Sequence, residues 1–207
     1  MKKNIPPATI RRLPIYLQTL RELYLRGVRI ISSAELGDIL EITPEQLRKD
    51  LTFFGNFGRK GIGYNVEELS ESIEKILGLK NQWRVAIVGA GHLGTALANY
   101  EIFPELGFET VAIFDIDERV IGSEINGVKV YDFEKINSVA KRKNFDIGIV
   151  AVPPENVREV CDALVDAEVK GIWNFAPVKP EVPPEIIVVN ENLSVGLGAL
   201  SFRLAQQ

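Results

Sequence analysis

Glycines at a fixed spacing follow an apolar run near the middle of the chain. Residues 84–88 read Arg-Val-Ala-Ile-Val, and the segment Gly89-Ala90-Gly91-His92-Leu93-Gly94 comes directly after them, before a stretch with helical spacing of apolar residues. A second apolar run ends in Asp115, 21 residues after Gly94. A glycine loop that ends a strand and opens a helix, followed by an acid about 20 residues later, is typical of a dinucleotide-binding βαβ unit. A βαβ unit without a ligand is the simpler alternative.

The glycines and the acid would have separate tasks in such a unit. We expect Gly89 to make the turn, Gly91 to let a pyrophosphate approach the backbone, and Gly94 to let helix and strand pack closely. The phosphates would lie on the free N–H groups at the helix N-terminus. Asp115 suits hydrogen bonds to a ribose diol and would repel a 2′-phosphate, so the pattern favours NAD(H) over NADP(H).

Strand-like and helix-like segments alternate through the rest of this region. Strands are expected at 84–89, 110–115, 128–130, 146–152, 171–175 and 186–189, with helices at about 133–143 and 154–168. This alternation predicts a doubly wound α/β domain, a Rossmann domain with a parallel sheet, over residues 81–190. Ligands of such sheets bind beyond the carboxyl ends of the strands. We therefore expect Val152, Pro153, Asn174 and Phe175 near the ligand.

Most proteins with this glycine pattern are dehydrogenases, so an NAD-dependent dehydrogenase is the alternative function. Hydride transfer usually needs a general acid or base beside the nicotinamide. The single histidine, His92, lies inside the glycine loop, and the single cysteine, Cys161, falls on the inward side of a predicted helix. No segment remains to build a substrate domain, so we expect a binding protein without a catalytic residue or a metal site. A CoA-binding Rossmann protein is a third interpretation, which the ribose-type acid Asp115 disfavours.

The net charge of −4 is distributed unevenly along the chain. Residues 1–64 carry 11 Lys and Arg against 6 Asp and Glu, a net charge of +5, whereas residues 81–207 carry 11 against 18, a net charge of −7. Such asymmetry suggests a basic module joined to an acidic one. We place the basic module at residues 1–80 and expect it to bind nucleic acid.

Two short helices are predicted inside the basic module, after a first amphipathic helix with Ile10, Leu13, Leu17, Leu20 and Tyr24 on its buried face. Ser32 and Glu35 form a capping-box pattern, and Thr43, Pro44 and Gln46 form a second helix start. The second helix keeps Leu47, Leu51 and Phe54 inward and carries Gln46, Arg48, Lys49 and Thr52 on the rest of its surface. A helix-turn-helix needs such base-reading side chains near the start of its second helix. A small helical bundle with a charged surface is the alternative.

Four glycines lie in the next ten residues, 55–64, together with Arg59 and Lys60. Because glycine permits tight turns with positive φ, we expect a hairpin with these two cations at its tip. A basic hairpin directly after a recognition helix is the wing of a winged helix, and it would reach phosphate or a minor groove. An interdomain linker is the alternative. A last helix, starting at Asn65 and ending at Gly78, would close the module.

The C-terminal segment, residues 191–207, has leucines at helical spacing but also Gly196 and Gly198. Each glycine weakens a helix by roughly 1 kcal/mol, so this helix needs a partner surface, either on its own domain or on another subunit. Helix-turn-helix proteins usually bind DNA as dimers, and an exchanged C-terminal helix would supply the required symmetry.

Cellular location follows from what the chain lacks. It has one cysteine, no apolar run long enough for a bilayer, and a charged start without the apolar core of a signal peptide. We expect a cytoplasmic protein that does not bind membranes.

Six segments of the chain form a pattern that is specific to one family. They are Ile10-Arg-Arg-Leu-Pro14, Gln46-Leu-Arg-Lys-Asp-Leu51, Phe54-Gly-Asn-Phe-Gly58, Gly61-Ile-Gly-Tyr64, Gly89-Ala-Gly-His-Leu-Gly94 and Asn174-Phe-Ala-Pro177. Through these segments, and across almost its whole length, the sequence resembles the Rex family of redox-sensing transcriptional repressors. The resemblance implies a homodimer with domain-swapped C-terminal helices, which binds operator DNA while NAD⁺ prevails and leaves it as NADH accumulates, controlling anaerobic and fermentation genes.

The resemblance and the pattern together give two sets of expected site residues. The DNA-binding set is Ser32, Ser33, Thr43, Gln46, Arg48, Lys49, Arg59, Lys60 and Gly61. The NAD(H)-binding set is Gly89, Ala90, Gly91, His92, Leu93, Gly94, Tyr100, Asp115, Ile116, Val152, Pro153 and Phe175.

One position departs from the family pattern. Family members often carry Val-Asp-Leu-Ser at the entry to the swapped helix, and that acid joins a tyrosine and an arginine between subunits. Here Asn192 stands in place of the acid and cannot form an ion pair. Tyr100 and either Arg11 or Arg12 are the candidate partners that remain.

Overall fold

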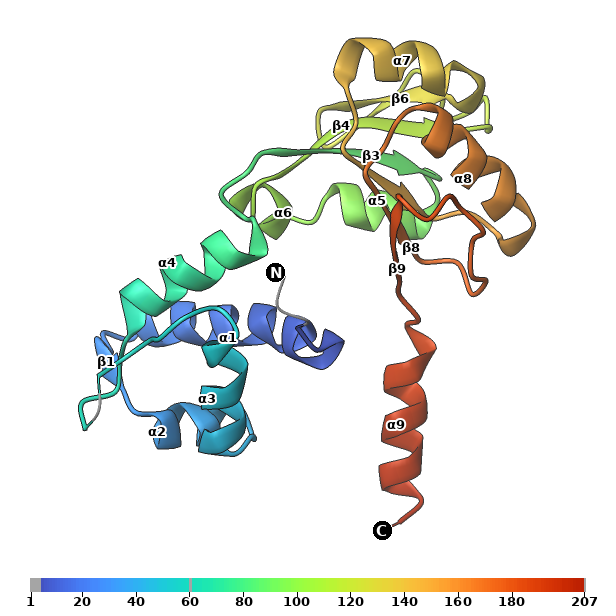
Figure 1. Cartoon of the computed structure of the whole chain (residues 1–207). Helices are drawn as coiled ribbons and strands as arrows, with labels where there is room; N and C mark the ends of the chain where they lie inside the picture. Colours follow the sequence, from blue (N-terminus) through green and yellow to red (C-terminus); the bar gives the residue numbers. More distant parts are fainter. Residues whose placement is uncertain (1–4, 60, 207) are drawn as a thin grey trace. The chain divides into compact units, whose positions relative to one another are not determined.

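The computed structural model describes residues 5–59 and 61–206, and the chain divides into two compact units. One unit ends at Asn81 and the other begins at Gln82. Figure 1 shows the elements of both units. No helix in the described ranges is both long and apolar enough to cross a membrane.

The N-terminal unit is a winged helix. Its helices are α1 (Pro7–Leu25), α2 (Ser33–Ile39), α3 (Pro44–Thr52) and α4 (Val66–Leu77), and its short strands are β1 (Ile30–Ile31) and β2 (Tyr64–Asn65). The two strands pair antiparallel, with Ile31 opposite Tyr64. Gly78 ends α4 in the left-handed conformation that favours glycine, as the sequence predicts.

The core of this unit gathers around α1. Leu13, Leu17 and Leu20 are buried as expected, but Ile10 is 49% exposed and Tyr24 lies at the edge with its ring under the Arg29 guanidinium. The prediction was wrong for these two residues because the buried stripe of α1 runs slightly to one side of them. The helix instead buries Thr9, Tyr16 and Leu23.

The second unit is a doubly wound Rossmann domain with a seven-stranded sheet. The strand order is β5-β6-β4-β3-β7-β8-β9, and every pairing is parallel except that of the edge strand β5 with β6. The strands are β3 (Trp83–Val88), β4 (Phe108–Asp115), β5 (Glu124–Ile125), β6 (Val128–Asp132), β7 (Ile147–Val150), β8 (Gly171–Asn174) and β9 (Ile187–Asn190). The six parallel strands follow the 3-2-1-4-5-6 order of dinucleotide-binding folds.

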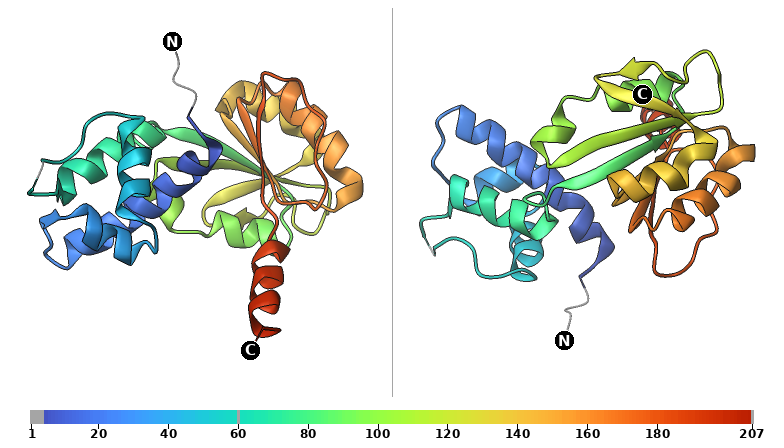
Figure 2. Two further views of the ribbon diagram at one scale, coloured as in Figure 1. Left: turned by 60° about the horizontal axis from the view of Figure 1, so that its bottom comes forward. Right: turned by 90° about the horizontal axis from the view of Figure 1, so that it is seen from above.

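Helices cover both faces of this sheet (Figures 1 and 2). On one face, α5 (His92–Ala98) and α6 (Ile102–Glu105) pack near Val85 and Ile87; on the other, α7 (Ile136–Lys143) and α8 (Val157–Asp166) pack near Ala86 and Val88. Side chains alternate between the faces because successive residues of a strand point to opposite sides. Helices α7 and α8 begin later than predicted, since residues 133–135 and 154–156 form 3₁₀ turns.

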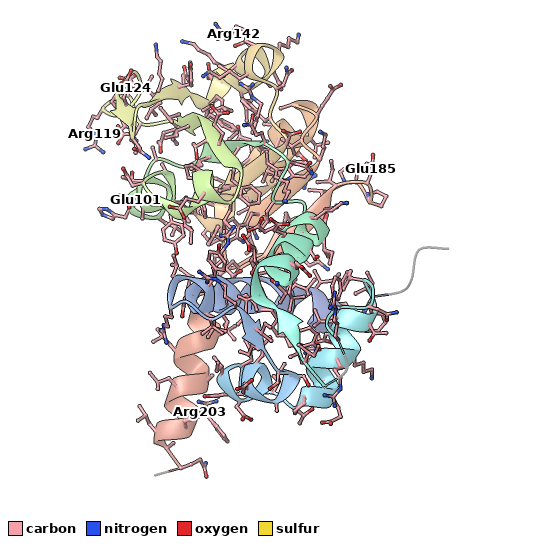
Figure 3. The ribbon with its side chains drawn as sticks, turned by 90° about the vertical axis from the view of Figure 1, so that its left-hand side faces the viewer. Glu101, Arg119, Glu124, Arg142, Glu185 and Arg203 are labelled. Atoms are coloured by element: carbon pink, nitrogen blue, oxygen red, sulfur yellow. The ribbon has the colours of Figure 1, made fainter. Side chains whose placement is uncertain are left out.

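The chain leaves the sheet after β9 and forms α9 (Ser194–Leu204). No residue of α9 is buried, and Arg203 projects outward near its C-terminal end (Figure 3). An apolar helix without any buried side chain has no packing partner within its own unit.

Candidate functional site

The glycine loop between β3 and α5 has the geometry that each glycine needs. Gly89 has φ +103°, a region that side chains rarely adopt, and a Cβ there would overlap the carbonyl oxygen of Ala151. A Cβ on Gly94 would overlap the Gly89 carbonyl oxygen. A Cβ on Gly91 would meet no heavy atom within 4 Å. Gly89 and Gly94 are therefore required by the fold, whereas the space at Gly91 lies open at the start of α5.

Asp115, the last residue of β4, ties this loop to the neighbouring strand. Its Oδ2 accepts a hydrogen bond from the Ala90 N–H at 2.6 Å, and its Oδ1 accepts from the N–H groups of Ile116 and Asp117 at 2.8 and 2.9 Å. A carboxylate has about four acceptor positions, so about one remains for a ribose hydroxyl. Ile116, 70% exposed, follows directly.

The strand order reverses between β3 and β7, which is where such sheets open a crevice for ligands. A Cβ on Gly89 would lie 3.2 Å from Val152 Cγ1, so the glycine loop and the segment after β7 adjoin. Pro153 is exposed beside Val152. Phe175 follows β8, and its N–H donates to the Val150 carbonyl at 3.0 Å.

The other residues of the expected set differ in exposure. His92 is exposed and Leu93 is half-buried at the start of α5. Tyr100 is 55% exposed and packs edge-on against Phe103, with 5.1 Å between ring centroids. Nothing in residues 5–59 and 61–206 groups three metal-ligating side chains.

Cys161 lies on the inward side of α8, as predicted, and is fully buried. Burial, with a smaller contribution from Asp162, raises the pKa of its thiol to about 11. A thiol with so high a pKa is almost entirely protonated at neutral pH and is a poor nucleophile.

In the winged helix, both predicted helix starts are present. The Ser32 hydroxyl accepts from the Glu35 N–H at 3.1 Å while the Glu35 carboxylate accepts from the Ser32 N–H at 2.9 Å, which completes the capping box. The Thr43 hydroxyl accepts from the Gln46 N–H at 3.2 Å. These caps fix where α2 and α3 begin, and therefore which side chains α3 presents.

The expected base-reading residues of α3 differ in their surroundings. Arg48 is exposed, pairs with Glu45 at 2.7 Å and donates to the Ser33 hydroxyl at 2.7 Å. Lys49 is exposed. Gln46 is half-buried, and its Nε2 donates to the Asp50 carboxylate at 2.9 Å.

Asp50 is a functional candidate that the sequence analysis missed. It is fully buried on α3 and forms an ion pair with Arg12 at 2.7 Å. Burial opposes its ionisation, but hydrogen bonds from Arg12, Tyr16 and Thr9 outweigh burial and hold its pKa at about 2. The spacing of those three residues along α1 was the available signal. Of the two arginines named in the sequence analysis, Arg12 is therefore committed to Asp50.

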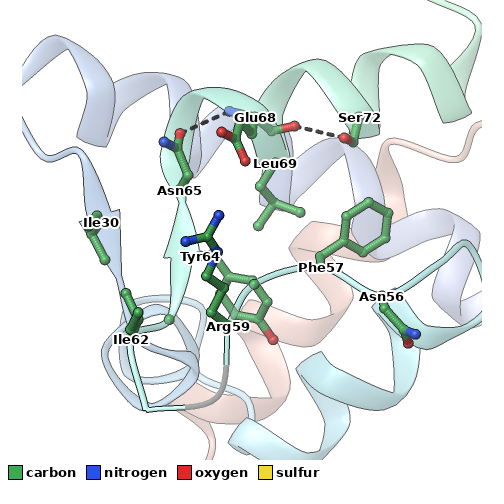
Figure 4. Close-up of a pocket in the computed structure, with 12 residues that line it drawn as sticks. Ile30, Asn56, Phe57, Arg59, Ile62, Tyr64, Asn65, Glu68, Leu69 and Ser72 are labelled. Atoms are coloured by element: carbon green, nitrogen blue, oxygen red, sulfur yellow. Dashed lines mark hydrogen bonds between the residues drawn. The ribbon is translucent and has the colours of Figure 1, made fainter.

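The expected wing is a hairpin closed by Arg59 and Gly63, whose backbone groups exchange hydrogen bonds of 2.9 and 3.0 Å. Arg59 and Gly61 are exposed, while Lys60 lies outside the described residues. The hairpin borders a cavity of about 640 Å³ (Figure 4). Its walls include Ile30, Phe57, Arg59, Tyr64, Asn65 and Leu69.

Asn192 takes a local role at the start of α9. Its Oδ1 accepts from the Ser194 N–H at 3.0 Å and from the Ser194 hydroxyl at 2.6 Å. These bonds satisfy a helix-start donor that would otherwise lack a partner. The side chain therefore starts the helix without carrying a charge.

Two family models match the chain. A putative DNA-binding protein N-terminus matches residues 4–52, and a CoA-binding domain matches residues 80–178. Among curated proteins, the redox-sensing transcriptional repressor Rex of Clostridium botulinum is 46% identical over 200 residues, which are 97% of this chain and 95% of the relative. Rex of Clostridium acetobutylicum is 46% identical over 205 residues, 99% and 96% of the two chains.

Solved structures that closely resemble this chain belong to the same kind of protein. The crystal structure of RSP in complex with β-NAD⁺ and operator DNA has a TM-score of 0.93 and 44% identity, covering 99% of this chain and 94% of RSP. RSP in complex with β-NADH has a TM-score of 0.92 and 42% identity, covering 99% and 96%. RSP is a Rex-family repressor, and these relatives are repressors rather than dehydrogenases. The chain belongs to the Rex family of redox-sensing transcriptional repressors.

Proposed function

We propose that this repressor binds operator DNA as a homodimer and is released when NADH occupies its Rossmann domain. One observation carries the proposal: a single chain joins a winged helix to a Rossmann domain whose glycine loop is open at Gly91. RSP, 44% identical over 99% of this chain, has been crystallised with both β-NAD⁺ and operator DNA. NAD(H) is therefore the sensed ligand and not a reacting cofactor.

We assign DNA binding to three parts of the winged helix. The start of α3 would enter the major groove with Gln46, Arg48 and Lys49, because a recognition helix reads bases with its N-terminal residues. Caps and turn residues would contact phosphate, and the cationic wing would follow the backbone. The supporting set is Ser32, Ser33, Thr43, Arg59, Lys60 and Gly61.

NAD(H) would bind along the carboxyl edge of the sheet. The pyrophosphate would lie over Gly91 and accept from N–H groups between Ala90 and Gly94, and the adenosine ribose would meet Asp115 with Ile116 beside it. His92 and Leu93 line this start of α5. The nicotinamide would reach Val152, Pro153 and Phe175, with Tyr100 nearby. Since burying a charge in apolar surroundings is costly, these residues favour the neutral dihydronicotinamide of NADH over the NAD⁺ cation.

The homodimer would form through exchange of the C-terminal segment, residues 191–207, which contains α9. Leu193, Leu197 and Phe202 are examples of its apolar side chains, each more than half exposed in one protomer. Ile10 and Ile15 on α1 are exposed apolar residues that a partner's helix could cover. Such a large uncovered apolar surface marks a protein–protein interface.

Release from DNA requires that NADH favour one dimer arrangement over another. A shift from 99:1 to 1:99 needs about 5.5 kcal/mol of differential binding. Two bound ligands would share this, so each would need to bind the released form more strongly by about 2.8 kcal/mol. We infer a cytoplasmic location, where the NADH/NAD⁺ ratio changes with metabolism.

The test is an operator gel-shift assay titrated with NADH and with NAD⁺. NADH should release the DNA at much lower concentration than NAD⁺. The control is Asp115→Arg, which should bind operator without ligand but resist release because the ribose contact is lost. Equal release by both nucleotides would refute redox sensing. Loss of DNA binding by ligand-free Asp115→Arg would refute our assignment of the dinucleotide site.

A further inference from the structure

The most heavily hydrogen-bonded side chain in the described part of the winged helix is the buried carboxylate of Asp50. It accepts five hydrogen bonds from four side chains. Thr9 Oγ1 donates to Oδ1 at 2.8 Å, Arg12 donates to both oxygens at 2.7 and 2.8 Å, Tyr16 donates to Oδ2 at 2.7 Å, and Gln46 donates to Oδ1 at 2.9 Å. Bonds to a buried charge are among the strongest in proteins, so α3 is held firmly at this point.

Three of the donors come from α1. Thr9, Arg12 and Tyr16 follow one another at steps of three and four residues, so they share one side of that helix. Because Asp50 lies in the second half of α3, one turn after Gln46, the network fixes both the rotation and the height of α3 against α1. The recognition helix is thus oriented by a charged contact in addition to its leucine core.

The fourth donor, Gln46, belongs to α3 itself. An ionised carboxylate accepts hydrogen bonds and donates none, so the Gln46 amide must turn its nitrogen toward Asp50. Its second N–H and its Oε1 form no other hydrogen bond among the described residues, and the side chain is half-buried at the third position of α3. The Gln46 amide is therefore held in one of its two flip states. Its second N–H remains available as a donor and its Oε1 as an acceptor.

We propose that Gln46 is a specificity-determining residue for one adenine in each operator half-site, and that Asp50 is the positioning residue that sets its amide. In the major groove, adenine offers the N6 donor and the N7 acceptor, which match Oε1 and the remaining N–H of Gln46. The proposal rests on the assignment of α3 as the DNA-reading helix. The new element is that the amide orientation of Gln46 is fixed before DNA binds. DNA binding therefore does not have to order this side chain, which removes an entropic cost.

The experiment measures base preference rather than affinity alone. Full-length protein first selects duplexes from a randomised double-stranded library, and each base pair of the selected duplex is then changed singly. The active fraction of every variant is measured by stoichiometric titration. A destabilised protein has a lower active fraction, but it keeps the same ranking of duplexes.

Wild type should prefer A·T at one position per half-site by roughly 5- to 150-fold, the range for a bidentate base contact. Gln46→Met should remove this preference and leave the other positions unchanged. Asp50→Asn should remove the same preference, because an asparagine side chain can donate from its Nδ2 and lets the Gln46 amide flip. The matched control is Arg21→Gln, which breaks the 2.9 Å ion pair between α1 and α4 and should keep the full ranking.

Several outcomes would overturn the proposal. It is wrong if Gln46→Met keeps every base preference, and this arm decides the matter even where Asp50→Asn fails to fold. It is also wrong if Asp50→Asn keeps the preference that Gln46→Met loses, since Asp50 then does not set the amide. Failure of wild type to select any duplex would instead refute the assignment of α3 as the reading helix.

Discussion

The open space at Gly91 allows a substitution that should separate ligand binding from folding. In Gly91→Ala, the added methyl group meets no protein atom within 4 Å, and the backbone, at φ −69° and ψ −169°, suits alanine. Replacing glycine by alanine restricts the unfolded chain and so stabilises the fold by about 0.4–1 kcal/mol. Alanine is a poorer helix N-cap than glycine by about the same amount, so the two effects oppose each other. We therefore expect the free energy of unfolding to change by less than about 1 kcal/mol.

NADH binding should respond quite differently. The methyl group would occupy the volume where the pyrophosphate approaches the backbone, so the phosphates lose their contacts with the start of α5. Losing one or two charge-assisted hydrogen bonds costs about 1.5–3 kcal/mol each, which corresponds to at least a tenfold rise in the Kd for NADH. Isothermal titration with NADH and urea unfolding of the same preparation measure the two quantities.

Gly94→Ala is the control for this experiment. Its methyl group would overlap the Gly89 carbonyl oxygen, and forcing extra volume into a packed site typically costs about 1–3 kcal/mol of stability. That variant should lose stability and NADH binding together. Unchanged NADH affinity in Gly91→Ala would refute our placement of the pyrophosphate, because the methyl group would then stand where nothing binds.

The remaining predictions concern charge and reactivity. Arg59→Ala should weaken binding to all DNA sequences about equally and reduce the slope of log K against log salt by about 1, as should Lys60→Ala, whereas Arg48→Ala should relax base preference. Because the pKa of Asp50 is lowered from 3.8 to about 2, its ionised carboxylate stabilises the folded protein fully above about pH 4, and this stabilisation is lost toward pH 2. The free energy of unfolding should fall by about 2 kcal/mol from this cause, as measured by acid unfolding followed by circular dichroism. This fall should be absent from Asp50→Asn. Cys161 should resist thiol reagents at pH 8 until the protein unfolds, and rapid labelling of native protein would contradict its burial.

Local patterns in the sequence predicted most helix starts and the glycine loop. The capping box at Ser32, the Thr43 cap and the left-handed Gly78 are short-range signals, because each depends on residues within one helical turn. The glycine loop was predictable for a similar reason: backbone conformation at Gly89 and close packing at Gly94 restrict those positions to glycine whatever surrounds them. The Rossmann fold was likewise readable from the alternating strand and helix patterns.

Contacts between distant residues could not be read in this way. The bonds of Asp50 to α1 join residues 34 to 41 positions apart, and nothing local distinguishes Asp50 from an exposed acid on a charged helix. The error at Ile10 and Tyr24 has a related cause, since helical periodicity gives the spacing of a buried stripe but not its exact rotation. The hydrogen bonds of Asn192 to Ser194 also depend on the geometry of the chain after β9, which the sequence does not reveal.

The exposure of α9 has a consequence for when dimers of this protein would form. In the proposed homodimer, a newly made protomer would present the apolar side chains of α9 to water until a second chain covered them, so folding and pairing would be successive steps and the second would depend on concentration. Separating two chains that had exchanged helices in this way would expose both apolar surfaces at the same time. Subunits should therefore seldom exchange between dimers. In a cell that makes an altered chain beside the normal one, the fraction of mixed dimers would be set while the chains are being made.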